Sequence, residues 1–206
     1  MKIPLRYQIT EYDCGPTSVL NGLSFLFERE EIPPEVVRNI MLYCLDGFGA
    51  DGFPGKSGTS YTAMTFLSHW LNGFGETGRL SISSSYLSGA EVHFGPTSRL
   101  RDALREGGAA VVRLDLEGWH YVLLTGIGDD EEVYLFDPYL PDGPLPEDVR
   151  IVEDHPTEYN RIVPAGVMVL EEKRPYAFGP VGTREAVLLF NARTAQTADN
   201  TVEYII

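Results

Sequence analysis

The order of hydrophobic patterns along the chain limits its possible folds more than any other sequence feature. Up to residue 108, apolar side chains recur every three to four residues, the spacing of one face of an α-helix. From residue 109 to residue 190 they form short runs rich in β-branched residues, which are typical of strands. Helices first and strands later predict an α+β domain rather than a parallel sheet with alternating helices.

Four helices are expected in the first half of the chain. Each prediction rests on apolar residues at helical spacing and on a capping residue or a proline near the start. The helices are expected from Val19 onward, after Pro33–Pro34, after Thr59 or Ser60, and after Thr97 or Ser98. A glycine-rich loop, residues 47–58, separates the second from the third.

Five strands are expected in the second half. They are Ala109–Leu116, Tyr121–Thr125, Val133–Phe136, Gly166–Leu170 and Ala186–Phe190. The proline-bearing stretch 138–164 is expected to be a loop. We expect a main domain over residues 1–172 and a C-terminal extension over residues 173–206, with one added strand and a polar tail.

Charge and composition exclude several classes of protein. Thirty acidic residues against sixteen basic ones give a formal charge of -14, which repels phosphate backbones and argues against a nucleic-acid partner. No apolar stretch is long enough for a membrane segment, and the N-terminus lacks the apolar core of a signal peptide. Two cysteines are too few for a disulfide framework, so we expect a cytoplasmic protein.

Cys14 lies where a helix is expected to begin, directly before Gly15 and Pro16. Free backbone N–H groups and the helix dipole favour an anion there, so a thiol at this place is stabilised as the thiolate. The same N–H groups can stabilise an oxyanion on an attacked carbonyl group. Gln8, six residues earlier, could fold back and donate a second hydrogen bond to that oxyanion.

His120 and Asp137 are candidates for the base and its partner. They lie in the two apolar runs on either side of an acidic turn, which should form an antiparallel hairpin. A two-residue turn at Gly128-Asp129 would place His120 directly opposite Asp137, with Cβ atoms about 4.5–5.5 Å apart. Asp137 would then orient the His120 ring and stabilise its charged form.

These motifs, in this order, resemble a known family. Gln8 with Asp13-Cys14-Gly15-Pro16, then His120-Tyr121-Val122-Leu123-Leu124, then Phe136-Asp137-Pro138, is similar to the bacteriocin-processing (double-glycine leader) peptidases and their stand-alone relatives in the papain-like superfamily. The resemblance spans residues 1–172. Transporter-linked members also carry membrane and nucleotide-hydrolysing domains, which these residues do not include, so cleavage after a double glycine is not carried over.

The resemblance implies a papain-like fold, in which a helical layer with the cysteine packs on an antiparallel sheet with the histidine and the aspartate. It implies Cys14 as nucleophile, His120 as general base and acid, Asp137 as the orienting group and Gln8 as oxyanion donor. It implies a cysteine peptidase acting on a peptide or protein substrate through a thioester, with no metal and no organic cofactor.

Three other functions stay open at this stage. The same triad suits an acyltransferase or a transglutaminase-like enzyme, because a thioester can pass its acyl group to water or to an amine. A catalytically silent peptide-binding module would carry the same residues. A relaxed phosphate-loop pattern over residues 50–57 would suggest a nucleotide hydrolase, but such a loop should follow a strand, and a helix is expected before it.

Overall fold

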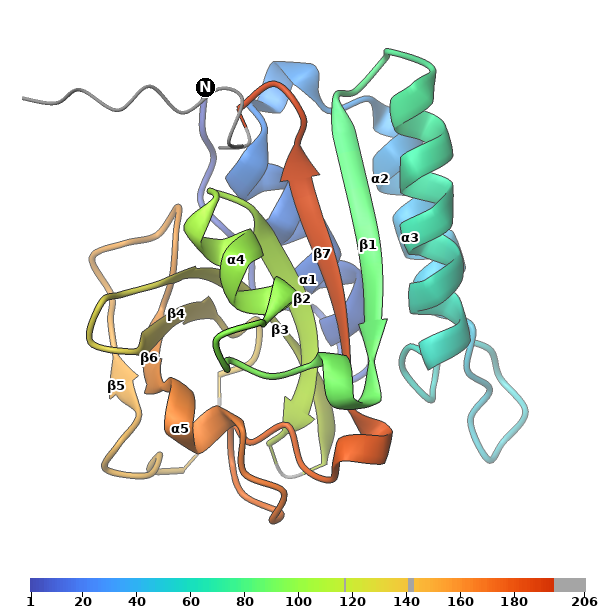
Figure 1. Cartoon of the computed structure of the whole chain (residues 1–206). Helices are drawn as coiled ribbons and strands as arrows, with labels where there is room; N and C mark the ends of the chain where they lie inside the picture. The colour runs from blue at the N-terminus through green and yellow to red at the C-terminus, as the bar shows by residue number, and fades with distance from the viewer. Residues whose placement is uncertain (117, 141–142, 195–206) are drawn as a thin grey trace, which may run out of the picture.

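A computed structural model describes residues 1–116, 118–140 and 143–194 (Figure 1). The described residues contain one antiparallel sheet of seven strands in the order β1-β7-β2-β3-β4-β6-β5. Its strands are β1 (Ile82–Ser88), β2 (Ala109–Asp115), β3 (Trp119–Ile127), β4 (Glu132–Phe136), β5 (Arg150–Ile151), β6 (Arg161–Pro164) and β7 (Glu185–Asn191). The helices are α1 (Cys14–Leu26), α2 (Pro34–Cys44), α3 (Tyr61–Glu76), α4 (Arg99–Arg105) and α5 (Ala165–Met168). The fold is therefore α+β.

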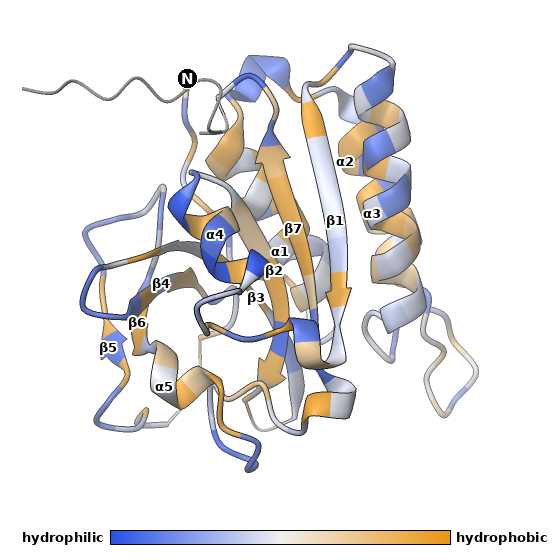
Figure 2. Ribbon diagram, viewed as in Figure 1, coloured by the Kyte–Doolittle hydropathy of each residue, from blue (hydrophilic) through white to orange (hydrophobic). Residues whose placement is uncertain are grey.

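The sheet is covered by helices on both faces. Odd-numbered residues of β2, such as Ala109 and Val111, pack with α1, α2 and α3, whereas the even-numbered Ala110 and Val112 pack with α4 and α5. Side chains on a strand alternate between faces, so a strand buried on both faces is apolar throughout. Figure 2 shows this hydrophobic character along β2 and β7.

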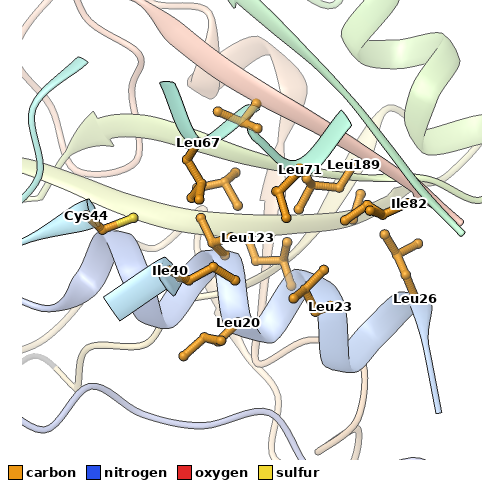
Figure 3. Packing of buried hydrophobic residues seen from close by; sticks show 14 of the residues in the cluster. Leu20, Leu23, Leu26, Ile40, Cys44, Leu67, Leu71, Ile82, Leu123 and Leu189 are labelled. Carbon is orange, nitrogen blue, oxygen red and sulfur yellow. The ribbon is translucent and has the colours of Figure 1, made fainter. Parts of the chain in front are cut away.

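The core beneath α1 is built mainly from leucines. Leu23 is fully buried, and Leu123 of β3 and Leu189 of β7 belong to the same cluster (Figure 3). Burying one leucine contributes about 1.5–3 kcal/mol, so this contact fixes α1 firmly on the sheet. The first residue of α1 is thereby fixed relative to β3.

The capping residues fix where two helices begin. The Ser60 hydroxyl accepts a hydrogen bond from the Ala63 N–H at the start of α3, and the Ser98 hydroxyl accepts one from the Arg101 N–H at the start of α4. Both serines satisfy an N–H group that the helix itself cannot pair. The expected caps are confirmed at both helices.

Strand β1 was not expected from the sequence. Its centre is serine-rich, and it is pale in Figure 2 beside the hydrophobic β7. Polar contacts hold it to α3, because the Asn72 side chain bonds both the N–H and the carbonyl group of Ser84, at 2.7 and 2.6 Å. The Ser68 and Ser84 hydroxyls are also 2.7 Å apart. Hydrophobic periodicity alone cannot detect such a strand.

The expected strand Gly166–Leu170 is wrong, because this apolar run begins with the single helical turn α5. The strand lies just before it, as β6, within the stretch expected to be a loop, which also contains β5. The Ala165 N–H bonds the Glu131 carbonyl, and the Val169 N–H then bonds the Ala165 carbonyl. A short apolar run cannot by itself distinguish a strand from a buried helical turn.

The segment 173–206, expected to be an extension, contributes β7, which lies between β1 and β2. The polar tail expected at its end lies mostly outside the described residues, which stop at residue 194. Within the described part of the chain, no helix has the length and apolar character needed to cross a membrane.

Candidate active site

Cys14 is the first residue of α1 and lines a cavity of about 400 Å³. The residue is 8% exposed, and it faces this cavity. The cavity is lined by residues from the N-terminal loop, the glycine-rich loop and the sheet: Glu11, Tyr12, Cys14, Ser57, Gly58, Thr59, Arg113, Trp119 and Tyr121.

Two backbone N–H groups are free at the start of α1. Neither the Cys14 nor the Gly15 N–H has an acceptor among the described residues, and Pro16 has no N–H. Gly15 is required here, because a Cβ atom at this position would lie 2.2 Å from the Thr59 hydroxyl oxygen. The helix start therefore offers two hydrogen-bond donors next to the thiol.

The loop before Cys14 folds around the buried carboxylate of Asp13. This carboxylate accepts hydrogen bonds from the Ile9 N–H at 3.0 Å and from the Thr10 N–H and hydroxyl, both at 2.6 Å. Burial raises the pKa of Asp13, but the bonds from Thr10 and Ile9 outweigh it and hold the pKa below its usual range. Asp13 thus stays charged and fixes the chain just before Cys14, a role that sequence reasoning missed.

His120 and Asp137 are bonded and buried. The distance from His120 Nε2 to Asp137 Oδ1 is 2.7 Å, and the two residues are 7% and 0% exposed. His120 lies near the start of β3, and the Ser18 hydroxyl of α1 bonds the carbonyl of the next residue, Tyr121, at 3.0 Å. This contact ties the first turns of α1 to the histidine strand.

Cys14 also acts on the His120 ring and raises its pKa. Because Asp137 occupies Nε2, the nitrogen left for the thiol is Nδ1. Burial lowers the pKa of His120, but the hydrogen bond to Asp137 and the charges of Asp137 and Cys14 outweigh it and raise the pKa to about 10. The ring is therefore charged at neutral pH, and a charged imidazole stabilises a neighbouring thiolate.

The expected register of the β3–β4 hairpin is wrong. Leu123 pairs with Phe136 and Leu124 with Leu135, so continuing the ladder places Tyr139, not Asp137, opposite His120. The His120 and Tyr139 rings are in contact, with centroids 6.1 Å apart. Asp137 is then the diagonal neighbour of His120, on the same face of the sheet.

The turn explains the shift in register. It has three residues rather than two, with the Gly128 N–H bonded to the Glu132 carbonyl and Glu131 at φ 62°. A three-residue turn that ends in a left-handed residue is a common hairpin connection. A bulge between Leu124 and Gly126 shifts the pairing once more.

Asp137 is held by residues that sequence reasoning did not identify. Its Oδ1 also accepts the Tyr139 N–H at 2.9 Å, and its Oδ2 accepts the Tyr176 hydroxyl at 2.7 Å. The Asn160 side chain bonds both the N–H and the carbonyl of Asp137, each at 2.8 Å. No local motif marks Tyr176 or Asn160, which lie 39 and 23 residues after Asp137.

Gln8 lies beside the site, and its side-chain amide bonds the backbone of its own loop. Its Nε2 donates to the Thr10 carbonyl at 2.8 Å, and its N–H bonds the Pro138 carbonyl at 2.9 Å, next to Asp137. It lines a second hollow of about 270 Å³, which shares Glu11 with the Cys14 cavity. An oxyanion role would require the amide to turn away from Thr10.

The remaining candidate residues lie elsewhere. Cys44 is fully buried, and burial raises the pKa of its thiol far above the ordinary value. The phosphate-loop-like segment 50–57 follows helix α2 rather than a strand, and Lys56 is paired with Asp51 at 2.9 Å. In the described ranges no group of three or more His, Cys, Asp or Glu side chains forms a metal cluster.

Comparison with known proteins assigns no family. No protein-family model matches the chain, and no curated protein matches it in sequence. The function must therefore be inferred from the geometry of this site.

Proposed function

We propose that this chain is a papain-like cysteine peptidase in which Cys14, His120 and Asp137 form the catalytic triad. The observation that carries the proposal is the position of the His120 ring, which is bonded to Asp137 at 2.7 Å and lies near enough to Cys14 for that side chain to raise its pKa. The proposed nucleophile, base and orienting group therefore lie next to one another in that order. This arrangement activates a weak nucleophile.

In the proposed reaction, the Cys14 sulfur attacks the carbonyl carbon of an amide bond and a new S–C bond forms. The carbonyl oxygen takes up the displaced electron pair. The tetrahedral species collapses, the C–N bond breaks, and charged His120 gives its proton to the departing amine. His120 then takes a proton from water, whose oxygen attacks the thioester carbon. The C–S bond breaks, the acid is released, and the Cys14 thiolate beside charged His120 is restored.

The free N–H groups of Cys14 and Gly15 are suited to stabilise the oxyanion. They need no reorganisation, because α1 already begins at this point. Gln8 is proposed as an additional donor, which reaches the oxyanion when its amide leaves the Thr10 carbonyl.

A peptide fits the surroundings of Cys14 better than a small molecule does. The Cys14 cavity shares Glu11 with a hollow of about 270 Å³ and shares Arg113 with another of about 540 Å³. Each of these two hollows therefore adjoins the Cys14 cavity at the residue that it shares with it. An extended chain could lie across all three with its amide bond at the thiol, which supports a peptide or protein substrate.

The proposal is tested by the rate at which iodoacetamide alkylates the two cysteines at pH 6, with each site identified by mass spectrometry. We expect Cys14 to react much faster than glutathione, because only a thiolate held by a charged histidine persists at this pH. Cys44 is the internal control and should stay unlabelled in the folded chain. A Cys14 rate no greater than that of glutathione would favour the silent binding module instead.

A fluorogenic peptide library then tests hydrolysis. Cys14→Ala should abolish turnover and leave the thermal unfolding midpoint close to that of the parent chain. Cys44→Ala should retain turnover, although it empties a small part of the core. Turnover that survives in Cys14→Ala would exclude Cys14 as the nucleophile.

A further inference from the structure

The carboxylate of Asp137 is occupied on both oxygens. Oδ1 accepts from His120 and from the Tyr139 N–H, and Oδ2 accepts from the Tyr176 hydroxyl at 2.7 Å. Asp137 and Tyr176 are both 0% exposed, so bulk solvent does not reach these bonds. A carboxylate bonded on both oxygens cannot rotate without losing a bond on one side.

Tyr176 keeps its hydroxyl there in an unfavourable backbone conformation. Its φ is 67°, a left-handed value that is rare and unfavourable for a bulky residue. Backbone hydrogen bonds just after Tyr176 hold the chain in this conformation. The Phe178 N–H bonds the Met168 carbonyl at 2.7 Å, and the Gly179 N–H bonds the Leu170 carbonyl at 3.1 Å.

Arg184 reinforces the same segment from the other side. Its guanidinium is buried and bonds the carbonyls of Gly179, Val92 and Val169. The stretch around Tyr176 is therefore fixed to the rest of the fold. It belongs to the segment after residue 172, which the family resemblance does not cover.

We propose that Tyr176 is a positioning residue of the candidate triad: its hydroxyl holds the Asp137 carboxylate, and through it the His120 ring, in the orientation that presents Nδ1 to Cys14. The inference rests on the proposed function, because it assigns Tyr176 a role in that same site. It also makes the segment that follows residue 172 a part of the catalytic machinery.

The ionisable groups around Asp137 decide the sign of the expected effect. The side chains of His120 and Tyr176 bond it directly, Tyr139 bonds it through its backbone N–H, and the charges of Cys14 and Arg161 act on His120 and Tyr176 respectively. Burial and the charge of Asp137 raise the pKa of Tyr176, so its hydroxyl stays protonated and remains a donor. The hydrogen bond from Tyr176 stabilises the negative charge of the carboxylate, and this weakens the attraction of Asp137 for the proton on His120.

Removing that donor should therefore strengthen the pull of Asp137 on the His120 proton. In Tyr176→Phe we expect the titration midpoint of His120 to rise by about half to one pH unit. We also expect turnover per folded molecule to fall by about tenfold to a hundredfold, because the unrestrained carboxylate no longer holds the ring. A merely structural tyrosine would lower stability and leave the midpoint unchanged.

The experiment is an NMR titration of the four histidine rings in the full chain, with His120 assigned by its loss in His120→Gln. The matched control is Tyr134→Phe, which removes a hydroxyl from β4, where the ring stacks on Tyr159. Its hydroxyl bonds none of the triad residues within the described chain. The titration midpoint of His120 in Tyr134→Phe should equal that of the parent chain.

A second variant keeps the test decisive if Tyr176→Phe does not fold. Site-specific 3,5-difluorotyrosine at position 176 retains the hydroxyl and makes it a stronger donor, so the His120 midpoint should fall instead of rise. Equal midpoints in the parent chain, the fluorinated chain and Tyr176→Phe, where it folds, would overturn the proposal.

This titration needs no substrate, so its outcome is separate from that of the peptidase proposal. A shifted midpoint together with an unreactive Cys14 would support the hydrogen-bond network and reject the peptidase. A reactive Cys14 together with unshifted midpoints would support the peptidase and reject the role of Tyr176.

Discussion

His120 and Asp137 form a 2.7 Å hydrogen bond although they are not paired residues of the β3–β4 ladder. The register places them diagonally, and the bond forms because the carboxylate is turned toward the ring. Tyr139, Tyr176 and Asn160 hold Asp137 in this position. The proposed chemistry of the site depends on this contact more than on any other.

Removing the charge of Asp137 should remove most of the thiol's reactivity. In Asp137→Asn we expect the alkylation rate of Cys14 at pH 6 and peptide turnover to fall by roughly 10²- to 10⁴-fold. The physical reason is that a neutral amide cannot stabilise the charged His120 ring. The basic limb of the pH–rate profile should move to lower pH, because the pKa of His120 falls.

Asp154→Asn is the matched control, since Asp154 is an exposed carboxylate that also bonds a histidine, His155, at 2.8 Å. In this variant, Cys14 should be alkylated and peptides should be hydrolysed at the rates of the parent chain. An Asp137→Asn chain that is as reactive as this control would exclude Asp137 as the orienting group.

The stability of the fold should fall as the pH rises above neutrality. The pKa of His120 is raised from 6.5 to about 10 in the folded chain, so protonation of this ring stabilises the fold. That contribution is complete below about pH 6.5 and is lost as the pH passes through about 10. Thermal unfolding midpoints between these pH values should therefore decline.

Substitution of His120 measures how much of this decline in the unfolding midpoint the residue causes. His120→Gln should show a flatter dependence of the unfolding midpoint on pH over the same range. His155→Gln removes a histidine that is 40% exposed and should retain the parent slope. Identical slopes for His120→Gln and the parent chain would count against a raised pKa.

Gln8 should affect acyl transfer but not the nucleophile. We expect Gln8→Ala to slow acylation of Cys14 by p-nitrophenyl acetate by about tenfold to a hundredfold, because this step builds an oxyanion. Alkylation by iodoacetamide forms no oxyanion and should keep its rate, which makes it the internal control. Equal acylation rates in the two proteins would assign the oxyanion to the N–H groups of α1 alone.

Two glycine substitutions should act in opposite directions on stability. Gly15→Ala places a Cβ atom 2.2 Å from the Thr59 hydroxyl, so we expect a loss of about 1–3 kcal/mol and reduced Cys14 reactivity. Gly73→Ala lies inside α3 with nothing within 4 Å of the new Cβ and should add about 0.5–1 kcal/mol. Urea unfolding of both variants measures the difference, and a neutral Gly15→Ala would mean that Thr59 moves freely.

The sequence by itself determined the local elements and the candidate chemistry. The caps Ser60 and Ser98 mark two helix starts, and the apolar runs of β2, β3, β4 and β7 mark four strands, because these signals lie within a few neighbouring residues. Cys14 and His120 stand out for the same reason. The serine-rich β1 escaped detection because polar contacts with α3, rather than apolar periodicity, hold it in place.

Only the tertiary structure decided how these parts meet. It placed β7 between β1 and β2, set the hairpin register through Glu131 and a bulge, and brought Tyr176 to Asp137 across 39 residues. Strand pairing and buried hydrogen bonds join residues far apart in the chain, so no local pattern specifies which partner each will find. Cys14 can therefore be proposed as a nucleophile from its own neighbourhood, whereas the residues that hold His120 in place depend on the completed fold.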